Sequence, residues 1–168
     1  MPYRCAICGE EHDDLPDYGF AWPDYYFGVP EKEREARVRG TADTCRIDEH
    51  CFIRGVILLP LIGDERSFGI GVWVTQHPTN FQTYLDDFDS AEIGPFFGWL
   101  SNRIPFYEKD TLQMKTRAHF QGGGQRPIIE LAECDHPLYH DWRGGIQVQR
   151  AFEFVHSIDG EGGPKLAT

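Results

Sequence analysis

The chain has 168 residues, of which 40% are hydrophobic and 14% aromatic, a composition that fits one globular domain and argues against disorder. Sixteen Lys and Arg face 27 Asp and Glu, for a formal net charge of −11, so we expect any protein partner to be basic. Such a surface repels phosphate backbones, and no stretch approaches the roughly 20 apolar residues that span a bilayer, which together predict no nucleic acid and no membrane as partner.

The N-terminal segment combines thiols and an imidazole at the spacing of metal ligands. Cys5 and Cys8 are separated by two residues, Gly9 follows the second thiol, and His12 comes soon after. Two thiolates at this spacing bind one tetrahedral ion from a tight turn, which glycine eases, and sulfur with imidazole selects zinc. The segment therefore predicts one Zn²⁺ ion held by Cys5, Cys8 and His12.

The fourth zinc ligand is not found in this segment. Cys45 is the first choice, because it begins the strand-rich region and would tie the metal to a sheet, and His50 and Cys51 are the alternatives. We expect the zinc to be structural, because a short segment with few apolar side chains gains little from burial. The alternatives are a catalytic zinc with an open position for water, two buried thiols beside a surface histidine with no metal, and a redox dithiol.

Two segments follow before the strand-rich region. Residues 18–27 are rich in aromatic side chains, which more often fill a core than form a binding face. Residues 31–39 predict a solvated helix that begins at Pro30 and ends at Gly40. Its glutamates precede arginines by four positions, the favourable order, in the pairs Glu33 with Arg37 and Glu35 with Arg39.

From Cys45 onward the pattern changes to strands. Residues 51–60 are apolar and β-branched, and residues 68–76 are apolar on both faces, so a turn at 63–65 predicts an antiparallel hairpin. The remaining periodicities predict strands at 96–100, 112–121 and 127–132, and helices at 78–88, 137–142 and 146–158.

This order of elements predicts an α+β fold, with a mostly antiparallel sheet, flanking helices and an N-terminal zinc knuckle. We expect a single domain over residues 1–158, which includes the knuckle at about 3–15, followed by a flexible tail at 159–168.

Two further motifs have a structural and a functional interpretation. Asp135 and His136 precede Pro137, which is typical of a helix start with Asp as the cap, and we favour this over a catalytic histidine oriented by a carboxylate. Gly122–Gly124 lies between two predicted strands and lacks the Lys and Ser of a phosphate loop, so we predict a hairpin connection. No catalytic residues are predicted.

The cysteines and the first residues bear on the compartment. Five cysteines are an odd number, and the chain begins without an apolar signal-peptide core. We therefore expect reduced thiols or metal ligands, and a cytoplasmic protein.

Seven short motifs occur in the same order as in a known family, and the chain resembles the bacterial domain-of-unknown-function family 2199 from about Tyr3 to about Val155. The resemblance implies a bacterial source and one compact domain with a cysteine–histidine N-terminus, and it implies no activity. A cysteine also stands at Cys45 in that family pattern, which favours it as the fourth ligand. The motifs are Cys5-x2-Cys8-Gly9-x2-His12, Pro23-Asp24-Tyr25-Tyr26-Phe27, Phe52-Ile53-Arg54-Gly55, Gly71-Val72-Trp73-Val74, Phe97-Gly98-Trp99-Leu100, Arg126-Pro127 and Asp135-His136-Pro137-Leu138.

The sequence thus predicts a zinc-stabilised, non-enzymatic protein-binding module. One version is an immunity or antitoxin-like protein whose acidic surface covers a basic toxin. The alternative is a zinc-dependent hydrolase with an open metal site.

Overall fold

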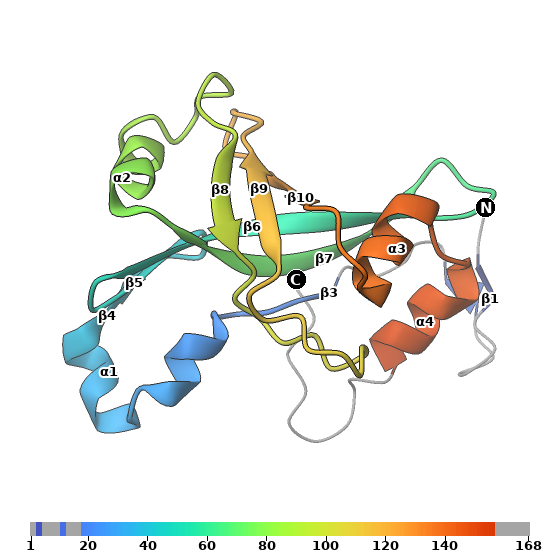
Figure 1. The fold of residues 1–168 in the computed structure, drawn as a ribbon, viewed down its shortest axis with the longest axis horizontal. Coiled ribbons are helices and arrows are strands. Elements are labelled where there is room, and N and C mark those ends of the chain that lie inside the picture. Colours follow the sequence, from blue (N-terminus) through green and yellow to red (C-terminus); the bar gives the residue numbers. More distant parts are fainter. Residues whose placement is uncertain (1–2, 5–10, 13–17, 157–168) are drawn as a thin grey trace.

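A computed structural model describes residues 3–4, 11–12 and 18–156 of the chain (Figure 1). The two N-terminal pieces are the short strands Tyr3–Arg4 (β1) and Glu11–His12 (β2), which form an antiparallel pair. The predicted zinc knuckle and the predicted tail at 159–168 otherwise lie outside this range. Among the helices that the structure describes, none has the length and apolar character needed to cross a bilayer.

The centre of the fold is the predicted antiparallel hairpin, which is confirmed. His50–Pro60 (β6) pairs along its length with Ser67–Gln76 (β7), and Thr44–Ile47 (β5) and Val38–Gly40 (β4) extend the sheet beyond β6. The apolar, β-branched side chains of both long strands are buried on the two faces of the sheet, which is why this segment forms strands.

The main sheet is mixed, so the prediction of a mostly antiparallel sheet is wrong. Tyr18–Gly19 (β3) runs parallel to β7, and Ile128–Leu131 (β10) runs parallel to β6. Beyond β10, Lys115–His119 (β9) pairs antiparallel with β10, and Phe96–Trp99 (β8) pairs antiparallel with β9. A strand pattern marks which residues are extended, but it does not show which distant strand lies beside them.

The sheet curls until its last strand returns to the central hairpin. Just after β8, Leu100 forms a bridge with Val74, and the backbone N–H of Ser101 donates to the carbonyl of Trp73 at 2.8 Å. Gly98 makes this approach possible, because a Cβ atom at this position would overlap the carbonyl oxygen of Thr75.

The helices cover the ends and edges of the sheet (Figure 1). The predicted helix at 31–39 is shorter than expected, because β-branched Val38 begins strand β4. Glu33 and Arg37 form the expected ion pair at 3.6 Å, whereas Arg39 donates to the carbonyl of Glu35 at 2.6 Å. The described helices are Asp24–Gly28 (η1, a 3-10 helix), Glu31–Arg37 (α1), Pro78–Asp86 (α2), Pro137–Gly144 (α3) and Val148–His156 (α4).

Candidate functional site

The predicted zinc ligands fall into two groups. Cys5 and Cys8 lie outside the described residues, and His12 is described only as the backbone of β2. The backbone of Arg4 pairs with that of Glu11, and the backbone of Tyr3 with that of His12. This pairing places His12 beside the residues that precede Cys5, which is compatible with ligands close in sequence binding one ion.

The predicted fourth ligand lies in the main sheet. Cys45 of β5 is completely buried, and burial raises the pKa of its thiol to about 11. Figure 1 shows β5 and β1 at opposite sides of the molecule. Of the alternatives, His50 is exposed against the ring of Tyr25, and Cys51 is buried. Coordination by Cys45 stays a prediction. Within residues 18–156, no three His, Cys, Asp or Glu side chains lie close enough together to hold a metal ion.

The Asp-His-Pro motif begins helix α3, but its cap is His136 and not Asp135 as predicted. His136 is buried, and its Nδ1 accepts from the backbone N–H of Leu138 at 2.9 Å. The Nε2 hydrogen is then shared between the carbonyls of Lys109, at 3.1 Å, and Asp110, at 3.2 Å. Because both ring nitrogens of His136 are hydrogen-bonded to backbone groups, the side chain has a structural role.

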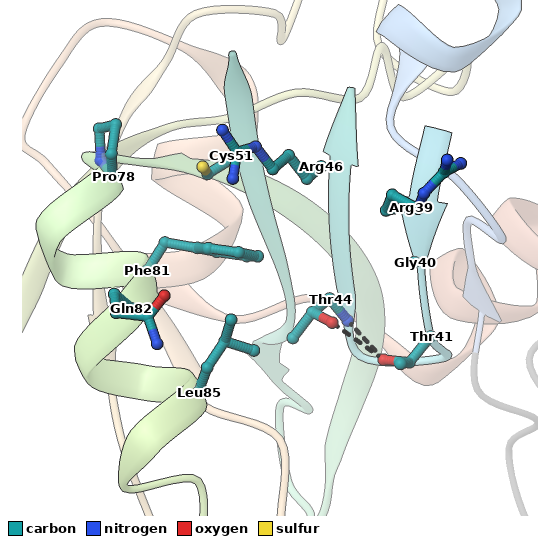
Figure 2. A pocket seen from close by; sticks show the side chains of 10 residues that line it. All are labelled: Arg39, Gly40, Thr41, Thr44, Arg46, Cys51, Pro78, Phe81, Gln82 and Leu85. Carbon is teal, nitrogen blue, oxygen red and sulfur yellow. Dashed lines mark hydrogen bonds between the residues drawn. The ribbon is translucent and has the colours of Figure 1, made fainter. Parts of the chain in front are cut away.

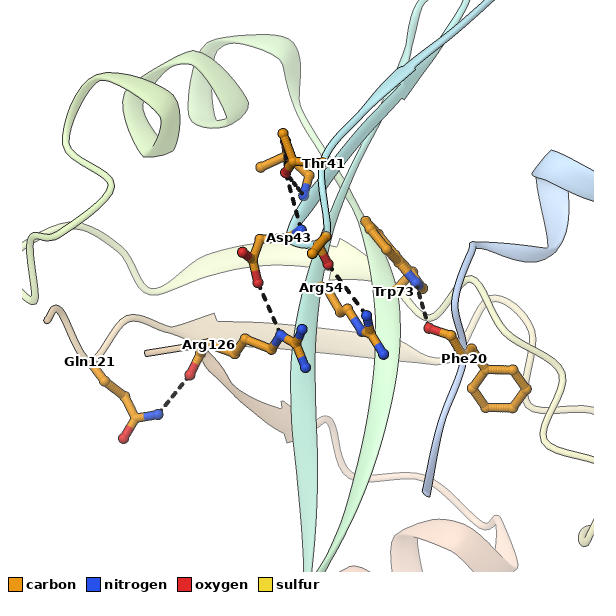
Figure 3. Close-up of polar contacts among 9 residues, drawn as sticks. Phe20, Thr41, Asp43, Arg54, Trp73, Gln121 and Arg126 are labelled. Carbon is orange, nitrogen blue, oxygen red and sulfur yellow. Dashed lines mark hydrogen bonds and ion pairs between the residues drawn. The ribbon is translucent and has the colours of Figure 1, made fainter. Parts of the chain in front are cut away.

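The turn between β4 and β5 is held on the sheet by two arginines (Figure 3). Arg126 Nε donates to Asp43 Oδ1 at 3.0 Å, and Arg54 Nη1 donates to the carbonyl of Ala42 at 3.4 Å. Burial and the nearby charge of Arg126 lower the pKa of Arg54, whose Nε is buried without a partner within the described part of the chain. These contacts fix the position of the turn.

The outer face of β8 and β9 has the composition of a binding surface, unlike His136 and the turn between β4 and β5. Phe97 and Trp99 point outward from β8, 48% and 36% exposed, with their ring centroids 5.1 Å apart. Arg117 of β9 lies opposite Phe97, and Lys115 lies opposite Trp99. We call these four residues the aromatic–cationic face.

A groove continues this face toward helix α3. Its volume is about 340 Å³, and Arg117 is shared between the groove and the aromatic–cationic face. Tyr139 and Trp142 of α3 line it with half-buried rings 5.8 Å apart, and Arg143 adds a second guanidinium. Glu130 and Glu133 also line the groove. The surface therefore presents four aromatic rings on a sheet and a helix, with the cations of the aromatic–cationic face at one end and both signs of charge within the groove.

The composition of this surface matches that of energetic centres in protein interfaces. Trp, Tyr and Arg are enriched there, because they bury a large area at a small cost in side-chain entropy. Neither Lys115 nor Arg117 forms an ion pair within residues 18–156, whereas the neighbouring Glu130 pairs with His119 at 2.9 Å. Carboxylates of a partner would form ion pairs with these two cations.

This surface is not predicted from the sequence, although Phe97 and Trp99 lie in one of the seven family motifs. A signal was present in the alternation of Lys115 and Arg117 with buried Thr116 and Ala118. That alternation shows a strand with a cationic outer face, but the aromatic neighbours become visible only once β8 is known to pair with β9.

Comparisons with known proteins return one family. The sequence model of a family described as "Uncharacterized protein conserved in bacteria (DUF2199)" matches residues 4–146. No curated protein and no solved structure matches the chain.

Proposed function

We propose that this chain, which belongs to the bacterial family DUF2199, is a protein-binding module that uses the aromatic–cationic face. The observation that supports the proposal is the exposed pair Phe97 and Trp99 on a strand whose neighbour carries Lys115 and Arg117. Exposed aromatic rings that are adjacent and rimmed by charge are typical of interaction sites.

The partner that fits this face presents an apolar segment with carboxylates. Burying Phe97 and Trp99 supplies most of the free energy of binding. Arg117 orients the partner through a bidentate ion pair with one of its carboxylates. The prediction of a basic partner came from the net charge of −11 and stays a prediction. The local charge of the face favours an acidic segment, because short-range contacts depend on the nearest groups and not on the total.

Site-specific crosslinking tests this proposal. A photoreactive phenylalanine analogue at position 97, in the bacterium that carries the gene, is expected to capture a discrete protein. The same analogue at Phe27, which is 65% exposed on η1, is the control and should not capture it. Trp99→Ala should weaken binding of the captured protein by about tenfold to hundredfold, as at interface centres.

Two results would contradict this use of the face. One is equal capture from positions 97 and 27, which would show that crosslinking follows exposure. The other is unchanged affinity of the purified partner for Trp99→Ala and for Arg117→Glu, when both variants melt at the parental temperature.

We further propose that one zinc ion, held by Cys5, Cys8 and His12, stabilises the β1–β2 segment. The support is the ligand spacing together with the antiparallel pairing of β1 with β2. Elemental analysis of protein purified without added metal should find about one zinc per chain, and Cys5→Ser should remove it.

Cys45→Ser tests the fourth ligand, with Cys134→Ser, at an exposed thiol, as its control. Weaker zinc retention in Cys45→Ser alone assigns the ligand to Cys45. Unchanged retention excludes Cys45 and leaves His50 or Cys51, and a folded parent protein without zinc would refute the metal site itself.

A further inference from the structure

A cavity separates helix α2 from strands β4–β6 (Figure 2). Its volume is about 390 Å³, which is in the range of small-molecule sites. One wall is the sheet, with Arg46, Thr44 and Cys51, and the other is α2, with Phe81 and Leu85. This cavity shares no residue with the aromatic–cationic face, and Cys51 is the one residue it shares with the candidates for the fourth zinc ligand.

Arg46 supplies a cation at one end of the cavity. It lies opposite Cys51 of β6, and Figure 2 shows its side chain extending across the sheet toward that thiol. Its Nε donates to the carbonyl of Asp48 at 3.2 Å, and its Nη atoms bond to no residue that the structure describes. The guanidinium therefore has two amino groups available, and no carboxylate within 18–156 neutralises it.

A second arginine beside it is already engaged. Arg39 lies opposite Arg46 on β4, which places like charges on adjacent strands. Figure 2 shows Arg39 pointing away from Arg46, and its Nη1 donates to the carbonyls of Glu35 and Val38. A bound anion would reduce the repulsion between the two guanidinium groups.

Thr44 supplies a hydrogen-bond donor at the other end. The Oγ1 of Thr41 accepts from the backbone N–H groups of Asp43 and Thr44, both at 3.1 Å, and lies 3.0 Å from Thr44 Oγ1. These two bonds occupy the lone pairs of the Thr41 hydroxyl, so Thr41 donates its hydrogen to Thr44. The hydrogen of the Thr44 hydroxyl is then free for a ligand, on a turn that Arg54 and Arg126 hold in place.

The space between these polar ends is apolar. Figure 2 shows Phe81 projecting from α2 toward the strands at a level between Arg46 and Thr44, and Leu85 projecting toward them at about the level of Thr44. Leu85 is 42% exposed, which leaves an apolar side chain open toward the cavity. A ligand that fits has a charged end, an apolar body and a hydrogen-bond acceptor.

We propose that this cavity binds an organic carboxylate. The carboxylate pairs with Arg46, the aliphatic part packs on Phe81 and Leu85, and the Thr44 hydroxyl donates to an acceptor further along the ligand. A single planar guanidinium matches a carboxylate, and the apolar wall favours a ligand with a hydrocarbon part over a phosphate ion. A free aliphatic acid and the C-terminal carboxylate of a peptide share this chemistry.

The test is a titration of the full chain, monitored by amide chemical shifts, with hexanoate, hexanamide and the peptide acid N-acetyl-Ala-Leu. Hexanoate is expected to shift residues of β5 and α2, and neutral hexanamide is not. Arg46→Gln should weaken hexanoate by about tenfold to hundredfold, the loss expected for hydrogen bonds to a charged group. Arg103→Gln, at an exposed arginine without ion pairs in the described residues, should bind like the parent.

Leu85→Ser should weaken hexanoate but leave acetate unchanged, because acetate has no chain to pack. Tighter binding of the peptide acid than of hexanoate would identify a protein C-terminus as the natural source, and the reverse order a free acid. Equal shifts from hexanoate and hexanamide, no shift from either acid, or parental affinity in Arg46→Gln would each overturn the proposal. None of these results affects the aromatic–cationic face, which crosslinking tests separately.

Discussion

Gly98→Ala is expected to lower the free energy of unfolding by about 3 kcal/mol, at the upper end of what overpacking usually costs. The added methyl group would overlap the Thr75 carbonyl oxygen and lie 3.0 Å from Gln76 Nε2. A backbone carbonyl in a paired strand cannot turn aside as a side chain can, so β8 has to move away from β7. The bridge between Leu100 and Val74 is then lost, and the sheet opens along one side.

Urea unfolding of Gly98→Ala beside the parent measures this loss. Gly144→Ala is the matched control, because a Cβ atom at Gly144 meets nothing within 4 Å and the residue lies in helix α3. The control should be as stable as the parent or slightly more stable, because Ala has the higher helix propensity. Equal stability of Gly98→Ala and the parent would show that β8 does not close against β7.

His136→Ala is expected to lower the free energy of unfolding by about 2–4 kcal/mol, from a lost helix cap and lost buried hydrogen bonds. The imidazole joins the start of α3 to the carbonyls of Lys109 and Asp110, and its removal leaves these groups unpaired beside a cavity. Calorimetry should therefore show a lower melting temperature. Binding at the aromatic–cationic face should persist below it.

The control for this variant is His140→Ala in the same helix. His140 is exposed and pairs with the fully exposed Asp135 at 3.0 Å, and such surface pairs contribute little to stability. The pair lowers the pKa of Asp135 through the hydrogen bond from His140, with Lys109 contributing as well. A His136→Ala variant that melts like the parent but no longer binds its partner would assign His136 a functional role instead.

Periodicity in the sequence predicted the secondary structure well, but predicted little about which segments meet. The central hairpin follows from two apolar runs joined by a short turn, because that information is local. The parallel partners do not, since β10 reaches β6 from far along the chain. The pairing of two residues, Ile128 with Val56, decides this part of the fold.

The candidate sites also differ in whether their residues are close together in the sequence or are brought together only by the fold. Arg46 and Leu85 lie far apart in sequence, and only the packing of α2 against β6, the neighbour of β5, makes them walls of one cavity. Asp135 was predicted as the cap because Asp is common at that position, yet His136 takes it, because an imidazole also reaches the carbonyls of Lys109 and Asp110. The ligand spacing of Cys5, Cys8 and His12 is local, so the sequence alone predicts it.

The curled sheet also limits how another chain can attach. Its outermost strands are β3, of two residues, and β4, of three, and β8 is blocked on its open side by β7. An extended peptide that adds to a sheet needs a longer row of free N–H and C=O groups than these edges offer. If the proposed partner binds, we therefore expect it to be recognised through side chains, and to tolerate changes in its own backbone conformation as long as its apolar and acidic groups keep their positions. In the main sheet, as far as residues 18–156 form it, the same short edges also disfavour pairing with a second copy of the chain.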